Sequence, residues 1–212
     1  MSGTFDHDKF IADVRSCENY PDHEFHGRFR AMAAAVPAGS RVLDIACGSG
    51  TLMAALKEKG CDCVGIDLAP GAVKLARSKG LNVHLGDVDS FEENAAVSSI
   101  LFAEYDVVIF SKCLMYLRNR NALMRKLRTG KILINQVNPY YWRFWIGHFP
   151  GDWVGQYLTA NGQEIQINSP RALMEWGASY GYRARRLHGG WLRGRDMVIV
   201  LSKSGSDLRP SS

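Results

Sequence analysis

An acidic residue followed by a glycine pair is the pattern in this sequence with the clearest chemistry. The run from Arg41 to Gly50, RVLDIACGSG, predicts a hydrophobic strand that delivers Asp44 into a turn containing Gly48 and Gly50. Glycine lets the backbone approach a ligand more closely than any side chain would permit. The helix expected over Thr51 to Glu58 points its N-terminal amides at the same place. The pattern therefore predicts a site for a nucleotide-like ligand.

The glycine spacing argues against two common nucleotide sites. A dinucleotide fingerprint needs G-x-G-x-x-G, and Met53 occupies the place of the third glycine. The sequence also has no G-x-x-x-x-G-K-[ST] run, which an NTPase would need. The pattern that remains, D-x-x-x-G-x-G, resembles the first motif of the class I S-adenosylmethionine (SAM) methyltransferases.

Three further strand ends follow in the order that this resemblance implies. Asp67 ends the run DCVGID and lies 23 residues beyond Asp44 (67 − 44 = 23), one strand-helix-strand unit later. A carboxylate at that place can accept both ribose hydroxyls of a nucleoside. A third strand ends at Gly86 and Asp87, and in the family such an aspartate meets the adenine amino group. A fourth strand, YDVVIFS, ends at Ser111, where the resemblance implies the methyl group.

The resemblance implies SAM as the cofactor and S-adenosylhomocysteine (SAH) as its product. The residues that we expect to bind the cofactor lie in or near these strand ends and in the segment before the first strand: Tyr20, Asp44, Ala46, Cys47, Gly48, Gly50, Asp67, Leu68, Gly86, Asp87, Val88 and Ser111.

Within the superfamily, the chain resembles the MetW group of small methyltransferase-like proteins. The likeness rests on the run from Tyr105 to Lys131 and on NPYYWRF at Asn138 to Phe144, and it spans about residues 41 to 145. MetW proteins are associated with homoserine acyltransferases, so the resemblance leaves two functions open. One is a methyltransferase for a small-molecule acceptor, and the other is a SAM-binding, non-catalytic partner of a metabolic acyltransferase.

The hydrophobic patterning predicts an α/β fold: a Rossmann-like, doubly wound sheet of seven mostly parallel strands with an antiparallel last strand. We expect a helical cap over residues 1–36, broken near Tyr20, and a methyltransferase domain over residues 37–204. Residues 138–168 form an acceptor-side insertion in this division, and residues 205–212 form a tail. Helices are also expected over 51–59, 71–79, 120–127 and 171–180.

Methyl transfer asks for an in-line nucleophile on nitrogen, oxygen or sulfur and for a general base when that nucleophile is protonated. Four residues are the catalytic candidates: His26, Tyr116, Tyr141 and His148. Asp152 and His188 could serve as the base as well. The histidines show no H-E-x-x-H spacing, so we assign no metal and expect a metal-independent transfer.

Composition indicates a small enzyme domain of 212 residues. No apolar run reaches the roughly 18 residues of a membrane span, and the first ten residues do not resemble a signal peptide, so we expect a cytoplasmic protein. The five cysteines are an odd number and should be reduced thiols. The net charge of +5 gathers late in the chain and is read as a solvated face rather than a nucleic-acid site. A homodimer is left open.

Overall fold

The computed structural model describes residues 7–25, 27–137, 170–190 and 193–203. Seven strands form one sheet: β1 (Arg41–Ile45), β2 (Asp62–Asp67), β3 (Asn82–Leu85), β4 (Glu104–Ser111), β5 (Arg128–Val137), β6 (Tyr182–Gly190) and β7 (Arg193–Lys203). Their order is β3-β2-β1-β4-β5-β7-β6. β7 runs antiparallel to both of its neighbours, and the other pairings are parallel. The predicted sheet is confirmed, including its antiparallel last strand.

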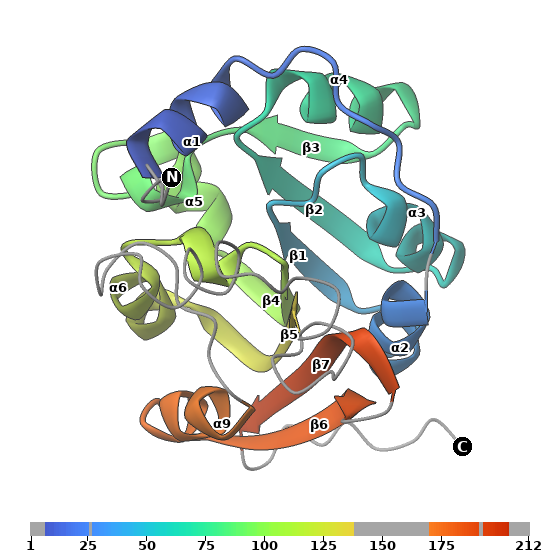
Figure 1. The fold of residues 1–212 in the computed structure, drawn as a ribbon, viewed down its shortest axis with the longest axis vertical. Helices are drawn as coiled ribbons and strands as arrows, with labels where there is room; N and C mark the ends of the chain where they lie inside the picture. Colours follow the sequence, from blue (N-terminus) through green and yellow to red (C-terminus); the bar gives the residue numbers. More distant parts are fainter. Residues whose placement is uncertain (1–6, 26, 138–169, 191–192, 204–212) are drawn as a thin grey trace, which may run out of the picture.

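Helices cover both faces of the sheet (Figure 1). On one face lie α2 (Gly27–Ala35), α3 (Thr51–Glu58) and α4 (Pro70–Ser78). On the other lie α5 (Ala95–Leu101), α6 (Arg120–Lys126) and α9 (Pro170–Ala178), together with the short 3-10 turns η1 (Val88–Ser90) and η2 (Leu114–Tyr116). Within the described residues, no helix is long and apolar enough to cross a membrane.

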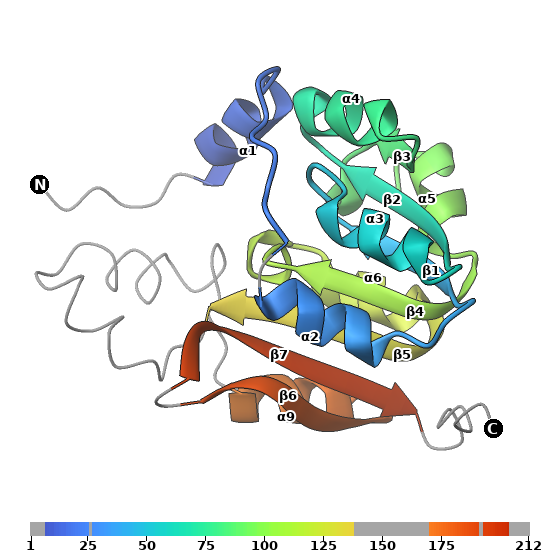
Figure 2. The ribbon, with the colours of Figure 1, turned by 90° about the vertical axis from the view of Figure 1, so that its right-hand side faces the viewer.

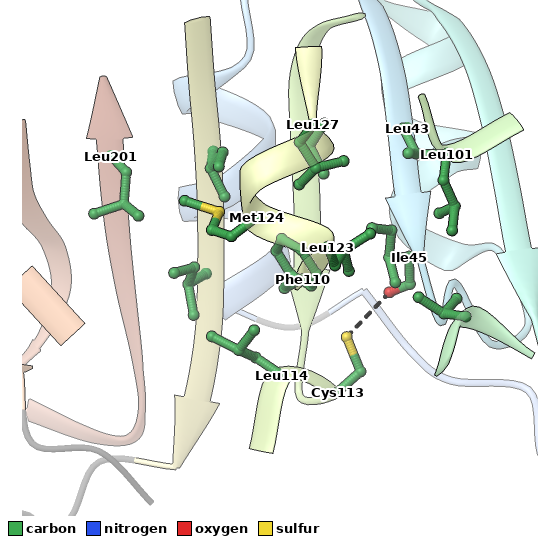
Figure 3. Packing of buried hydrophobic residues seen from close by; sticks show 14 of the residues in the cluster. Leu43, Ile45, Leu101, Phe110, Cys113, Leu114, Leu123, Met124, Leu127 and Leu201 are labelled. Atoms are coloured by element: carbon green, nitrogen blue, oxygen red, sulfur yellow. Dashed lines mark hydrogen bonds between the residues drawn. The ribbon is translucent and has the colours of Figure 1, made fainter. Parts of the chain in front are cut away.

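The core divides into two layers because successive strand residues point to opposite faces. In β1, Val42 packs with the α2–α4 layer, whereas Leu43 and Ile45 pack with the α5–α9 layer. Figure 3 shows the second layer, in which Leu123 of α6 and Phe110 of β4 lie close to Ile45. Burial on both faces explains why the strands read as nearly continuous apolar runs.

The element boundaries differ from the expected ones at several places. α5 was missed, although Asn94 caps it by accepting hydrogen bonds from the backbone N–H groups of Ala96 and Val97. β5 begins at Arg128, whereas the apolar pattern KILINQV predicts a strand only from Lys131 to Val137. The N-terminal segment holds two short helices, α1 (His7–Arg15) and α2, and the break predicted near Tyr20 is longer than expected, since residues 16–25 are not helical.

The first two helices differ in position. α2 is part of the core: Phe29, Met32 and Ala33 are buried in the same layer as α3. α1 instead lies beyond the carboxyl ends of the strands, toward which the arrowheads of β2 and β4 point in Figure 2. Within the expected cap, the described residues therefore include a helix above the sheet edge and a helix that packs on the sheet.

An extended segment, residues 16–25, joins these helices and is called the strap here. Figure 1 shows it crossing α4 and descending past α3. The backbone N–H of Gly71 in α4 donates to the carbonyl of Cys17 at 2.9 Å. At the other end, the Thr51 hydroxyl donates to the carbonyl of His23 at 2.7 Å. The strap is thus fixed to the first turns of two helices that begin at the carboxyl edge of the sheet.

The close approach of strap and α4 predicts the effect of Gly71→Ala. A Cβ at Gly71 would collide with the carbonyl of Glu18 and lie 2.9 Å from the Cys17 oxygen. We expect a loss of about 1–3 kcal/mol in unfolding free energy and faster hydrogen exchange in the strap. Gly27→Ala is the matched control, because a Cβ there meets nothing within 4 Å. Equal urea midpoints and equal strap exchange for the two variants would contradict this packing.

Candidate functional site

A cavity of about 360 Å³ opens at the carboxyl ends of the strands, beside the point where the strand order reverses between β1 and β4. Ligands of open α/β sheets bind at such a switch point, and the volume lies within the range of small-molecule sites. All of the residues expected to bind the cofactor line this cavity except Gly50. Apolar side chains from α1 complete its wall, namely Phe10, Ile11 and Val14.

Asp44 presents a buried carboxyl group to this cavity. The residue is 1% exposed, and its Oδ1 has no hydrogen-bond partner among the described residues. Burial, reinforced by the nearby charge of Asp67, raises the pKa of Asp44 to about 8. An unsatisfied buried carboxyl oxygen costs free energy, so this wall is suited to a ligand that brings a hydrogen-bond donor or a positive charge.

The turn after β1 is held in place by the end of β2. The Ala46 N–H donates to the carbonyl of Ile66 at 2.8 Å, and the Gly48 N–H donates to the Asp67 carboxylate at 2.7 Å. The other Asp67 oxygen accepts from the Ala69 N–H at 2.9 Å. Burial raises the pKa of Asp67, while these backbone donors act in the opposite direction. Asp67 therefore shapes the glycine turn as well as facing the cavity.

Positive backbone φ explains part of the turn's sequence. Gly48 has φ 57° and Gly50 has φ 73°, both in the left-handed region that favours glycine. Ala46 adopts φ 56° without that freedom. Gly50 does not line the cavity; a Cβ there would collide with Leu81, so the structure gives this glycine a packing role behind the turn.

Tyr20 of the strap lies directly against the glycine turn. A Cβ on Gly48 would lie 3.0 Å from the Tyr20 hydroxyl oxygen. Burial, with a smaller contribution from the charge of Asp67, raises the pKa of Tyr20 to about 12. Its phenol therefore remains a neutral hydrogen-bond donor at neutral pH.

The third strand end carries the contact that fixes α1. Asp87 accepts a hydrogen bond from the Arg15 guanidinium at 2.6 Å, and the N–H of Asp89 donates to its other oxygen at 2.9 Å. Farther along α1, Phe10 stacks on Tyr116 with ring centroids 4.7 Å apart. α1 thereby covers the part of the cavity between η1 and η2.

The fourth strand end brings cations to the opposite wall. Lys112 follows Ser111 and lies 3.0 Å from an Asp196 oxygen, measured from its Nζ. Arg28 of α2 approaches the same carboxylate at 3.5 Å through Nη1, and its buried Nε has no partner among the described residues. Lys112 and Arg28 both line the cavity. The site therefore has acidic groups on the β1–β3 side and basic groups on the β4 side.

The two cysteines of the cavity are poor nucleophiles. Burial raises the pKa of both Cys47 and Cys113 well above the ordinary thiol value, and the charge of Asp44 adds to the effect. Cys113 donates to the carbonyl of Ile45 at 3.2 Å, which joins the ends of β4 and β1 (Figure 3). These thiols are therefore structural rather than reactive.

The catalytic candidates are only partly placed. Tyr116 lines the cavity. His26, Tyr141 and His148, as well as Asp152, lie outside the described residues. His188 lies in β6 and does not line the cavity. Among the residues that the structure describes, no group of three or more His, Cys, Asp or Glu side chains is arranged to hold a metal ion.

Sequence reasoning overlooked Arg15, Lys112 and Asp196. Arg15 contacts a residue 72 positions away, and no local pattern announces that contact. Lys112 adopts φ 59°. Positive φ is uncommon for residues other than glycine, so nothing in the sequence indicates it at a lysine. Asp196 directly precedes the apolar run MVIVL at residues 197–201, and an acid at the start of such a run could have indicated a role at the sheet edge.

Comparisons with known proteins agree with this architecture. The family model described as "Methionine biosynthesis protein MetW" matches residues 26–149, more than half of the chain. A curated relative from Xanthomonas axonopodis pv. citri (strain 306), "Ubiquinone biosynthesis O-methyltransferase", is 32% identical over 111 residues, 48% of this chain and 45% of the relative. A relative of the same name from Leptothrix cholodnii is 25% identical over 158 residues, 71% of this chain and 67% of the relative. The chain spans about half the length of curated relatives such as two from Xanthomonas.

Solved structures show the same fold at low sequence identity. A SAM-dependent methyltransferase from Archaeoglobus fulgidus superposes with a TM-score of 0.62 at 18% identity, covering 93% of this chain and 95% of that one. Magnesium protoporphyrin IX methyltransferase from Synechocystis PCC 6803, solved with bound SAH, gives a TM-score of 0.60 at 15% identity, with 93% of each chain covered. The chain therefore belongs to the MetW family and has the Rossmann-like fold of the class I SAM-dependent methyltransferases.

Proposed function

We propose that this protein is a SAM-dependent methyltransferase that acts on a small-molecule acceptor. The observation that carries the proposal is the unsatisfied Asp44 oxygen in the wall of the cavity, beside a glycine turn with positive φ. A ligand with an ammonium group and a nucleoside satisfies both features. SAM is such a ligand, and solved neighbours of this fold hold SAM or SAH.

The amino-acid end of the cofactor fits the charges of the cavity. Asp44 can accept the ammonium group, since a cation within reach favours the ionised carboxylate that burial now disfavours. Arg28 can receive the carboxylate, because its side chain is 14% exposed and its buried Nε has no partner among the described residues. The zwitterion would thereby neutralise one buried acid and one buried base.

The nucleoside end fits the second and third strand ends. Each Asp67 oxygen accepts one backbone hydrogen bond and keeps a lone pair for a ribose hydroxyl. We assign Asp87 and the backbone of Val88 to the adenine edge and Leu68 to its apolar face, because all three line the cavity. Tyr20, Cys47, Gly48 and Gly86 complete the proposed cofactor site, with Ser111 toward the methyl group.

The chain's residues supply position and exclusion of water. Bound SAM supplies an electrophilic methyl group on sulfur, so an in-line nucleophile needs no metal for activation. α1 closes the cavity through the Arg15–Asp87 pair and the Phe10–Tyr116 stack. Tyr116 can hold or pass a proton at its hydroxyl; His26, Tyr141 and His148 stay candidates for the base, and residues 138–168 stay a proposed acceptor-side insertion.

The nature of the acceptor follows from the relatives rather than from the cavity alone. Curated relatives are named O-methyltransferases, which supports an oxygen acceptor over nitrogen or sulfur. Membership of the MetW family keeps the rival function, a SAM-binding partner of an acyltransferase. Calorimetric titration with SAM and SAH, followed by turnover of labelled SAM with small hydroxylated acceptors, separates the two. Micromolar binding without any turnover would favour the partner, and no binding would end the proposal.

Gly48→Ala should weaken cofactor binding strongly. The new Cβ would meet the Tyr20 hydroxyl at 3.0 Å in a backbone conformation with φ 57°. We expect SAH affinity to fall at least about 30-fold, from strain and contact together costing about 2 kcal/mol or more. Gly60→Ala is the control, because Gly60 has φ 76° but no neighbour within 4 Å. We expect both variants to lose similar stability, but only Gly48→Ala to lose SAH affinity. Equal SAH affinities in Gly48→Ala and Gly60→Ala would contradict the cavity assignment.

The ribose assignment of Asp67 is tested from the ligand side, because Asp67→Ala would also release the glycine turn. Adenosine and 2′,3′-dideoxyadenosine compete with SAH in a displacement titration. Wild type should prefer adenosine by about 10-fold or more, the value of a charge-assisted hydrogen bond. Asp67→Asn should reduce that preference to less than about threefold, even where both affinities fall. An undiminished preference in Asp67→Asn would refute the assignment.

Asp44 should make the ligand-free protein less stable as the pH rises. Its folded-state pKa of about 8 lies above the unfolded value of 3.8, so its stabilising contribution is present below pH 3.8 and is lost as the pH rises through 8. Asp44→Asn should therefore gain stability over wild type between pH 5 and pH 9, by about 1 kcal/mol or more at the upper end. Urea unfolding of wild type and Asp44→Asn at pH 5 and pH 9, without ligand, measures this difference. Parallel pH profiles would show that Asp44 is not perturbed by burial.

A further inference from the structure

Two residues other than glycine adopt positive φ in the described part of the chain: Ala46 at 56° and Lys112 at 59°. They follow β1 and β4, so they lie on the two sides of the switch-point crevice. A left-handed residue with a Cβ costs about 1–2 kcal/mol and persists where its surroundings fix it, often at functional sites. Ala46 belongs to the proposed cofactor turn, which accounts for its positive φ. Cofactor binding does not account for the positive φ of Lys112.

The backbone and the side chain of Lys112 are both fixed. Its N–H donates to the carbonyl of Asn135 at 2.8 Å, which ties the bend to the end of β5. Its Nζ lies 3.0 Å from Asp196 Oδ1, and its side chain is 31% exposed. Lys112 lines the cavity, so the bend turns a lysine that would otherwise continue β4 into the wall of the site.

Lys112 brings a cation to the β4 side of the cavity. It shares Asp196 with Arg28, the proposed partner of the cofactor carboxylate. The acids Asp44, Asp67 and Asp87 belong to the ends of β1, β2 and β3, whereas Lys112 follows β4 and Asp196 belongs to β7. Beside the Lys112 ammonium, a protonated amine would be repelled and an anion would be attracted.

Resting on the proposed methyltransferase function, we propose that Lys112 binds the nucleophilic oxygen of the acceptor as an oxyanion, so that the acceptor is a small molecule with an acidic hydroxyl group. The hydroxyl gives its proton to solvent before transfer. The oxyanion then attacks the methyl carbon: the oxygen–carbon bond forms, the sulfur–carbon bond breaks, and the electron pair of that bond remains on the sulfur of SAH. Lys112 stabilises the attacking form because a nearby cation lowers the pKa of a hydroxyl group.

The test uses 4-nitrophenol, whose ionised form absorbs visible light, bound to the protein saturated with SAH. In wild type the pKa of the bound phenol should fall by about one unit or more relative to free 4-nitrophenol. Lys112→Gln should remove this shift, and Lys112→Arg should keep most of it. SAH affinity, measured by calorimetry, should change less than threefold in both variants. Lys126→Gln is the control, because Lys126 also pairs with an acid, Glu92, but does not line the cavity.

Three outcomes would overturn the inference: 4-nitrophenol does not bind the SAH complex, it binds with an unshifted pKa, or the shift survives in Lys112→Gln. Loss of SAH affinity in Lys112→Gln, parallel to the loss of the shift, would assign the lysine to the cofactor's carboxylate instead. Failure of wild type to bind SAH is a separate result, because it contradicts the proposed function before Lys112 is tested.

Discussion

The Asp67 carboxylate makes the interaction on which the rest of the site depends. Its two oxygens accept hydrogen bonds from Gly48 in the turn after β1 and from Ala69 at the start of α4. One buried side chain thus fixes the glycine turn relative to α4. The strap then rests on both of these elements, through Cys17 on Gly71 and through Tyr20 against Gly48. Without Asp67, the glycine turn would no longer be held against the start of α4, and the strap, which contacts both, would lose its fixed position over the cavity.

The buried ionisable groups of the cavity, Asp44 and Arg28, lower the stability of the ligand-free protein. Asp44 is almost completely buried with an unsatisfied oxygen, and Arg28 has an unsatisfied buried nitrogen among the described residues. A protein selected for stability alone would replace such groups by apolar ones. Their retention at opposite walls of one cavity is what a zwitterionic ligand would require, because each buried charge then gains a partner on binding. The local cost is consistent with a functional site in an otherwise conventional fold.

The sequence was most informative where a local pattern has a single physical meaning. An apolar run ending in an acid, a glycine or a serine predicted the ends of β1, β2 and β4, because burial on both faces leaves few other interpretations. It failed for α5, whose seven residues are too short for helical periodicity to stand out. It also failed for contacts between distant positions, such as Arg15 with Asp87 and Arg28 with Asp196, and for the left-handed backbone of Lys112. Such features depend on tertiary packing, which no local pattern encodes.

The protons exchanged when SAH binds test the central claim most directly. With its pKa at about 8, Asp44 is mostly protonated in the free protein at pH 7. An ammonium group placed against it would drive ionisation, so binding should release about one proton per SAH. Calorimetric titrations at pH 7 in buffers of different ionisation enthalpy give this number. Release of about one proton in wild type and none in Asp44→Asn is the predicted result. SAH binding without proton release, or no binding, would contradict the account.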